Sequence, residues 1–171
     1  MWRVLVPVWC LLLATAGCSR TSPDELLRQA EEARAMQNFP MAIELYTRVI
    51  EDHPKSAQAE VSAFMIATTY NNDLRDYEKA IPAYREYLTR YPGAAQAPMA
   101  QFLIGYLYHN ELRNLDSAAA AYRAFLAMYP DHELARSATF ELENLGRPAE
   151  ELIPQDIAGT SPKENAGSKK K

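Results

Sequence analysis

The sequence has almost no cysteine, and the residues that commonly build metal centres are few. Its two cysteines are Cys10 and Cys18, so the chain beyond position 18 has no thiol for an internal disulfide or a zinc–thiolate cluster. Three histidines occur, in separate parts of the chain, at positions 53, 109 and 132. His132-Glu133 begins like a zinc-protease helix, but no second histidine follows to close the site. The sequence therefore predicts no metal centre.

Motifs for nucleotide binding and nucleophilic catalysis are also missing. The chain contains no CxxC pair, no Walker loop, no GxSxG elbow and no GxGxxG turn. Paired acids such as Glu31-Glu32 are expected on solvated helix faces. We therefore expect no enzyme, no cofactor and no small-molecule substrate, and an enzyme or solute-binding protein is the last of three readings.

The N-terminal segment, 1–17, has the composition of a secretory signal peptide. Arg3 precedes an apolar run from Val4 to Ala16, which is shorter than the ~18–20 residues that span a bilayer as a helix. Thr15-Ala16-Gly17-Cys18 resembles the bacterial lipobox, whose cysteine receives a diacylglycerol before the signal is removed. The alternative is a cysteine that happens to follow an ordinary signal. We expect a lipoprotein signal peptide at 1–17, lipidation of Cys18 and a tether at 18–23.

The body of the chain is acidic, whereas its C-terminal end is basic. Residues 19–153 hold 13 Lys or Arg against 20 Asp or Glu, a balance of −7, and residues 154–171 hold 4 against 2. This distribution argues against nucleic-acid binding. The C-terminal segment, 147–171, has no apolar periodicity after residue 153 and is rich in Pro, Gly, Ser and Lys, which predicts disorder from about residue 154. Its lysines either solubilise the chain or contact anionic lipid or peptidoglycan.

The most informative feature of the body is a long internal repeat. Prolines mark its step at positions 54, 92 and 130, and several other residue types recur in the same register. Fixed periods of 20–50 residues are typical of stacked supersecondary units, which use their surfaces for binding. The recurring sets are Ala42, Ala80 and Ala118; Tyr46, Tyr84 and Tyr122; Phe64, Phe102 and Phe140; and Ala59, Ala97 and Ala135.

Apolar spacing within each repeat is helical. Ala63, Ile66, Ala67 and Tyr70 follow the i, i+3, i+4, i+7 pattern of one helix face. A short polar segment separates the two helices of a repeat. The second helix then ends at a proline, preceded by tyrosine in the second and third repeats, because proline cannot continue the backbone hydrogen bonding. The sequence predicts seven helices, at about 24–36, 40–52, 57–72, 77–91, 95–110, 115–129 and 132–145.

These recurring positions resemble the tetratricopeptide repeat. The second helix of that repeat carries a small residue, an aromatic residue four positions later and then a proline, as in Ala42, Tyr46 and Pro54. The first helix carries a small residue where the two helices touch. That column is filled here by Ala30, Ala67 and Gly105.

The resemblance implies an all-α fold, a right-handed α-solenoid of three helix pairs plus a C-terminal capping helix. It covers residues 24–146, with repeats at about 24–54, 57–92 and 95–130 and the capping helix at 132–145. The repeat here is 38 residues long, whereas the usual period is about 34, so each repeat has four extra residues. We place one of them in each inter-helix turn and about three at the start of each first helix. Long first helices and the lipobox together resemble the periplasmic repeats of BamD-type and Tol-Pal-associated coordinator lipoproteins.

The resemblance also implies a binding groove. In tetratricopeptide repeats the first helices line the concave side, and their residues not used in packing bind an extended peptide. Aromatic rings bury the partner's side chains, and amide groups pair with its backbone. The alternative for the two phenylalanines is burial under the neighbouring helix. The predicted partner-binding groove consists of Arg34, Phe64, Thr68, Asn71, Met99, Phe102, Tyr106 and His109.

The leading hypothesis is a membrane-anchored adaptor or scaffold that binds protein partners in the bacterial envelope, in outer-membrane protein assembly or envelope maintenance. Cys18 and Asp24 are six residues apart, a tether of at most ~20 Å that favours a membrane-associated partner. By resemblance to other lipoproteins, Ser19 suits the outer membrane, with the chain facing the periplasm. The alternative is a structural, self-associating component of an envelope complex, for which Ala118–Ala121 offers a flat helix surface.

Overall fold

Helices make up nearly all of the chain between Pro23 and Glu143. The computed structural model describes residues 21–147, and within that range it contains seven α-helices, two π-helical turns and no strand. The all-α prediction is confirmed, whereas the predicted signal peptide, Cys18 and the predicted disordered tail lie outside the described residues. The α-helices are α1 (Pro23–Ala35), α2 (Phe39–Asp52), α3 (Ala57–Thr68), α4 (Tyr77–Arg90), α5 (Ala97–Tyr106), α6 (Leu115–Met128) and α7 (Ala135–Glu143).

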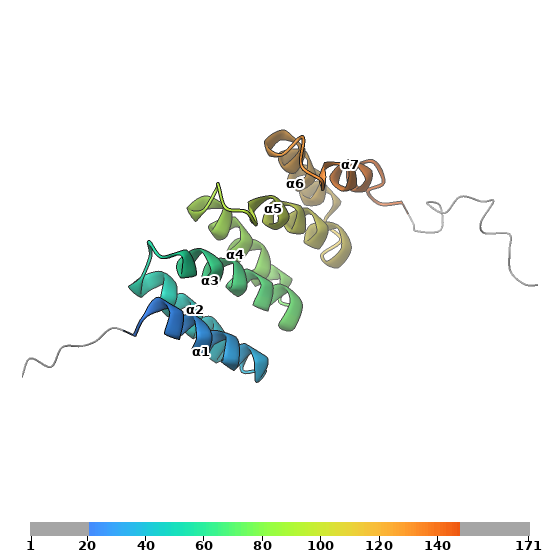
Figure 1. Ribbon diagram of the computed structural model, residues 1–171. Helices are drawn as coiled ribbons and strands as arrows, with labels where there is room; N and C mark the ends of the chain where they lie inside the picture. The colour runs from blue at the N-terminus through green and yellow to red at the C-terminus, as the bar shows by residue number, and fades with distance from the viewer. Residues whose placement is uncertain (1–20, 148–171) are drawn as a thin grey trace, which may run out of the picture.

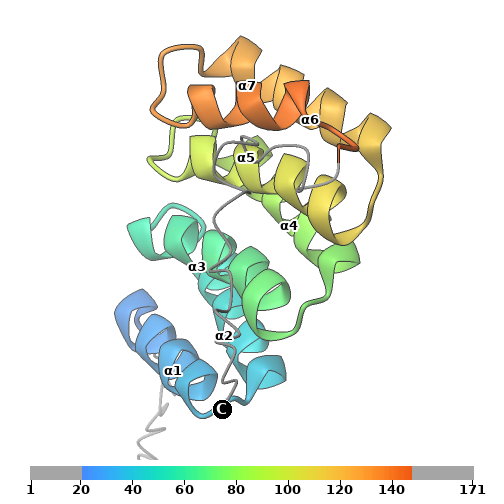
Figure 2. The same ribbon diagram turned by 90° about the vertical axis from the view of Figure 1, so that its right-hand side faces the viewer.

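The helices stack as pairs into an α-solenoid. Each α-helix packs against the next one in the chain, and Figure 1 shows the pairs α1–α2, α3–α4 and α5–α6 following one another, with α7 as the last helix. Figure 2 shows that α1, α3, α5 and α7 form one layer and that α2, α4 and α6 form a second layer. The turns between repeats therefore lie along one edge of the solenoid, and the turns within repeats lie along the opposite edge.

Five of the seven helices begin at a side-chain cap that the sequence supplies. In each, the side-chain oxygen of the residue before the helix accepts the backbone N–H three positions later, which satisfies one of the free donors of the first turn. The capping residues are Ser22, Asn38, Ser56, Asp76 and Asn114.

The first helices of the later repeats begin later than predicted. α5 starts at Ala97 rather than at 95, and α7 starts at Ala135 rather than at 132. Ser56 caps α3, but the equivalent position one repeat later is Ala94, which has no side-chain acceptor. The extra residues after the second and third inter-repeat prolines therefore form turns, and the predicted lengthening of these two helices at their starts was wrong.

The extra residue between paired helices is absorbed as a π-helical turn. α3 continues into a π-helix at Thr69–Asp73, and α5 continues into one at Leu107–Glu111. The Leu74 N–H donates to the Thr69 carbonyl at 3.0 Å, five residues back, and the same bond recurs one repeat later. The chain then reverses at an arginine with a left-handed backbone conformation, Arg75 at φ 52° in the second repeat and Arg113 at φ 53° in the third.

One fully buried tyrosine in each repeat joins the two helices of that repeat. Tyr46, Tyr84 and Tyr122 are each 0% exposed and lie on the second helices. A Cβ atom on Gly105 would stand 2.7 Å from the ring of Tyr122, so this glycine provides space for the aromatic ring. The small-residue column of the first helices is therefore the place where the paired helices approach most closely.

The tyrosine hydroxyls are buried with few hydrogen-bond partners. The Tyr84 hydroxyl accepts from Asn71 Nδ2 at 3.4 Å, whereas the hydroxyls of Tyr46 and Tyr122 have no partner within the described range. Burial raises the pKa of all three, and it raises the pKa of Tyr87, on the same face of α4, to about 12. The folded state therefore strongly favours these phenols in their neutral form.

We predict that Gly105→Ala destabilises the protein by about 1–2 kcal/mol. Overpacking costs roughly 1–3 kcal/mol, and the Tyr122 ring cannot move freely because it is fully buried against Phe102. Alanine recovers about 1 kcal/mol of helix propensity, which offsets only part of that cost. Gly93→Ala is the matched control, since nothing lies within 4 Å of a Cβ there. Urea denaturation measures both; equal midpoints for the two variants would contradict the prediction.

We also predict alkaline unfolding that depends on the buried tyrosines. A phenol has a pKa of about 10 when unfolded, and Tyr87 has one of about 12 when folded, so its stabilisation is complete below pH 10 and is lost as pH rises through 12. Each such tyrosine contributes a slope of roughly 1.4 kcal/mol per pH unit in that window. Tyr122→Phe removes one unpartnered hydroxyl and should flatten the slope in denaturation series at pH 8–12. An unchanged slope would count against the assignment.

Candidate functional site

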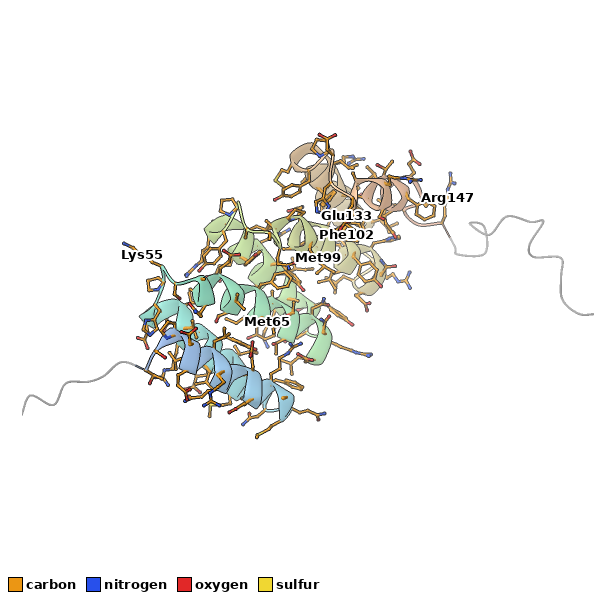
Figure 3. The ribbon with its side chains drawn as sticks, in the orientation of Figure 1. Lys55, Met65, Met99, Phe102, Glu133 and Arg147 are labelled. Carbon is orange, nitrogen blue, oxygen red and sulfur yellow. The ribbon has the colours of Figure 1, made fainter. Side chains whose placement is uncertain are left out.

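The eight residues of the predicted groove lie on the layer of first helices. Arg34 is on α1, two are on α3 and three on α5, and Asn71 and His109 lie in the π-helical turns that follow. Figure 3 shows Met99 and Phe102 on α5, with Met65 on α3, in this layer. The structure therefore brings the predicted residues to the same layer, although most of them are engaged within the chain.

The two phenylalanines pack between helices. The ring of Phe64 lies 5.9 Å from that of Tyr84 and 5.3 Å from that of Tyr87, both on α4. Phe102 makes the same two contacts one repeat later, at 5.6 and 5.9 Å, with the rings of α6. Both side chains are only partly exposed, because the neighbouring helix covers most of their surface. That either ring also contacts a bound partner stays a prediction.

The polar members of the predicted groove are bonded within the chain. Arg34 Nε lies 2.6 Å from Asp73 Oδ2, which links α1 to the π-helical turn of the next repeat. His109 Nδ1 lies 3.1 Å from Glu141 Oε2, which links the third repeat to α7. Thr68 Oγ1 donates to the carbonyl of Met65, three residues earlier, at 3.0 Å. The two ion pairs hold neighbouring repeats together, whereas the Thr68 bond stays within α3, and Asp73 and Glu141 were not predicted to take part.

The accessible apolar part of this layer lies on α5. Met99 is 37% exposed and Tyr106 is 39% exposed, and they are seven residues apart, two turns along one helix face. Phe102 lies between them and is partly covered. We call Met99, Phe102 and Tyr106 the α5 strip. It is the portion of the predicted groove from which a partner can remove apolar surface from water.

A small hollow with a mixed polar and apolar lining lies at the α1 end of the same layer. It has a volume of about 370 Å³, and the fully buried Tyr46 and the Arg34–Asp73 pair form part of its wall. Burial is the main cause of the raised pKa of Tyr46; Arg34 lowers it, and Glu31 and Asp73 raise it. The charged pair lines this hollow together with Ala35 and Met65, so the hollow offers both charge and apolar surface.

An apolar hollow that sequence reasoning missed lies on the layer of second helices. It has a volume of about 460 Å³ and opens between α2 and α4, with α3 as its floor; we call it the α2–α4 hollow. Pro82 lies inside α4 on its wall and lacks the N–H that would donate to the Glu78 carbonyl. The isoleucines on its α2 wall are half-exposed in the structure, but nothing in the sequence pattern indicates that a hollow opens beside them. The lining residues are Ile43, Thr47, Ile50, Glu51, Ala63, Ile66, Tyr70, Glu78, Lys79, Pro82, Ala83, Glu86, Tyr87 and Arg90.

Of the flat surface expected on α6, Ala118–Ala121, Ala119 is partly exposed and Ala120 is exposed, whereas the two end residues are covered. Ala118 is fully buried and Ala121 is 8% exposed, because both pack inside the solenoid. Within residues 21–147, no helix has the length and apolar character needed to cross a bilayer. In the same range, no three acidic, histidine or cysteine side chains gather as a metal site.

Comparison with known proteins agrees with the geometry of the helix pairs. Two family models, both described as tetratricopeptide repeat, match residues 26–56 and 73–133. The first match covers the α1–α2 pair, and the second runs from the turn before α4 through α6. No curated protein matches the chain. The stacked helix pairs, the repeated small and aromatic columns and these two matches together show that the chain belongs to the tetratricopeptide-repeat proteins.

Proposed function

We propose that this protein is a membrane-anchored adaptor of the bacterial envelope, which holds a protein partner on its first-helix layer. Tetratricopeptide repeats are protein-interaction scaffolds, and the observation that supports this surface is the α5 strip. Met99 and Tyr106 stay exposed there, whereas Phe102 on the same helix and His109 in the turn that follows are engaged in packing and pairing. A partner segment that covers the strip buries a thioether and an aromatic ring, which are typical interface anchors.

The anchor is proposed to be a lipid on Cys18. This cysteine closes the lipobox-like Thr15-Ala16-Gly17-Cys18 and precedes the first residue of α1, Pro23, by five positions. Five residues span at most ~18 Å, so α1 begins close to any membrane that holds the lipid. The absence of recognised catalytic motifs supports a binding role over an enzymatic one.

The contacts at the start of α1 support a particular orientation at the membrane. His53 Nε2 lies 2.8 Å from the Thr21 carbonyl, and Gln58 Nε2 donates to Asp24 Oδ1 at 2.5 Å. These bonds hold the entry to α1 beside the turn between α2 and α3, on the edge that carries the inter-repeat turns. With a lipid on Cys18, that edge faces the membrane and the α5 strip is open to a neighbouring envelope protein.

Within this role, we propose outer-membrane protein assembly or envelope maintenance as the pathway, because the lipobox-like segment beside the repeats resembles that of BamD-type and coordinator lipoproteins. The partner is then a membrane-associated protein. A second binding site has its own support, because the α2–α4 hollow is large enough for two or three apolar side chains and has a rim of Glu and Lys or Arg residues. An amphipathic helix would match that combination.

We predict that Cys18→Ala releases the protein from the membrane fraction. The substitution removes the thiol that would carry the lipid, and the described helices include none that could replace it as an anchor. Fractionation of cells that express the full chain, followed by metabolic labelling with a palmitate analogue, measures the effect. Cys10→Ala is the matched control and should stay in the membrane fraction. Retention of label by Cys18→Ala would disprove lipidation at this residue.

We further predict that a photoreactive phenylalanine at position 106 crosslinks a protein partner in cells. Tyr106 is 39% exposed, so the substitution leaves the fold intact; Met128, 52% exposed at the end of α6, is the matched control. Tyr106→Ala should weaken partner capture; because more than half of the side chain is buried, the urea midpoint of the variant is measured alongside and capture is compared at equal folded fraction. The same photoreactive residue is also placed at position 86, where Glu86 lies on the rim of the α2–α4 hollow. Crosslinks from position 86 without any from position 106 would place the binding site on the second-helix layer instead.

A further inference from the structure

α7 is the first helix of a fourth repeat that lacks its second helix among the described residues. Phe140 occupies the repeat position that Phe64 and Phe102 hold in the second and third repeats. Those two rings are covered by aromatic side chains of the next helix, but Phe140 is 53% exposed. The solenoid therefore ends on a large apolar side chain that faces out of the stack.

The sequence after residue 147 lacks the aromatic side chains that cover the equivalent rings of the second and third repeats. Residues 153–166 stand in register with α6, yet they include Pro154 and Pro162, and the whole of 148–171 contains no aromatic residue. The side chains that cover the equivalent rings are Tyr84 with Tyr87 and Tyr122 with Phe125.

A second helix of the usual kind does not fit on α7 either. Glu143 occupies the column that holds Ala67 in the second repeat and Gly105 in the third. At Gly105, even a single Cβ atom would stand 2.7 Å from the tyrosine ring of the next helix. A glutamate there leaves no room for that tyrosine, so the outer face of α7 must meet something of different shape.

The exposed face of α7 is complementary to itself. Arg136, Thr139, Phe140 and Glu143 follow the i, i+3, i+4, i+7 spacing of one face, with opposite charges at its two ends. Neither charged residue has an ion partner within residues 21–147. A two-fold axis between positions 139 and 140 places each Arg136 opposite the Glu143 of the other copy, twice in one interface.

Hollows for the apolar side chain flank the same face. One, of about 590 Å³, lies beside Phe140 and is bounded on its apolar side by Leu126 and Pro130. A symmetric pair of copies can seat each Phe140 in this hollow of the other copy, in the way that the internal phenylalanines are covered within the chain. We propose that the outer face of α7, formed by Arg136, Thr139, Phe140 and Glu143, is an isologous interface that binds a second copy of this protein.

Sedimentation velocity of the full chain over a concentration series tests the proposal. We expect a monomer–dimer equilibrium. Arg136→Glu and Glu143→Arg should each weaken the dimer about tenfold or more, because each places like charges opposite one another at two points. The double variant R136E/E143R restores opposite charges and should return the dimer to within about threefold of the wild type.

Two further variants separate association from folding. Arg48→Glu makes the same charge reversal on α2, at an exposed position near the other end of the solenoid, and should leave the dimer unchanged. Phe140→Ala should weaken the dimer while the monomer stays folded with a somewhat lower thermal midpoint, because just over half of the side chain is exposed. A wild-type chain that stays monomeric throughout, single reversals without effect or a double variant that fails to recover would each overturn the proposal.

Discussion

The contact between a small residue on a first helix and a buried tyrosine on the second helix determines the geometry of this solenoid. In the third repeat the contact is so close that Gly105 has no space for a Cβ beside Tyr122. The same positions recur from one repeat to the next, so each pair of helices adopts the same approach and each first helix returns to the same layer. The exposed apolar strip on α5 and the exposed ring on α7 both follow from that arrangement.

Polar contacts between repeats then limit which surface remains for a partner. Arg34 with Asp73 and His109 with Glu141 each join one repeat to the next, and all four side chains are partly buried. Removing one member of such a pair leaves a charge without its partner, so these residues are tied to the integrity of the stack. A partner that binds the first-helix layer therefore gains most from the apolar α5 strip beside these pairs.

The helices and their order could be predicted because their determinants are periodic or local. Tyr84 and Ala67 recur with the repeat, and caps such as Ser56 act on a backbone amide three residues away. The polar pairs could not be predicted in this way, because Asp73 and Arg34 belong to different repeats. The position of Asp73 is also not conserved within the chain: one repeat earlier it is Ala35, and one repeat later it is Glu111. The π-helical turns depend on backbone bonds between residues five apart, and the α2–α4 hollow depends on the distance between two helices. No residue pattern in the sequence indicates either feature.

A repeat array needs a device that stops further stacking, and α7 contains one in Glu143. A helix that only solubilised the end of the array would be polar along its whole outer face. Instead, the exposed Phe140 lies between Arg136 and Glu143 on the outer face. Glu143 leaves no space for an ordinary second helix, and the face still has an apolar centre with a charge at each end. If Cys18 carries the proposed lipid and the inter-repeat edge faces the membrane, the end of the solenoid would point along the membrane plane. Two such copies would meet end to end at a raised effective concentration, which would allow a small interface to suffice.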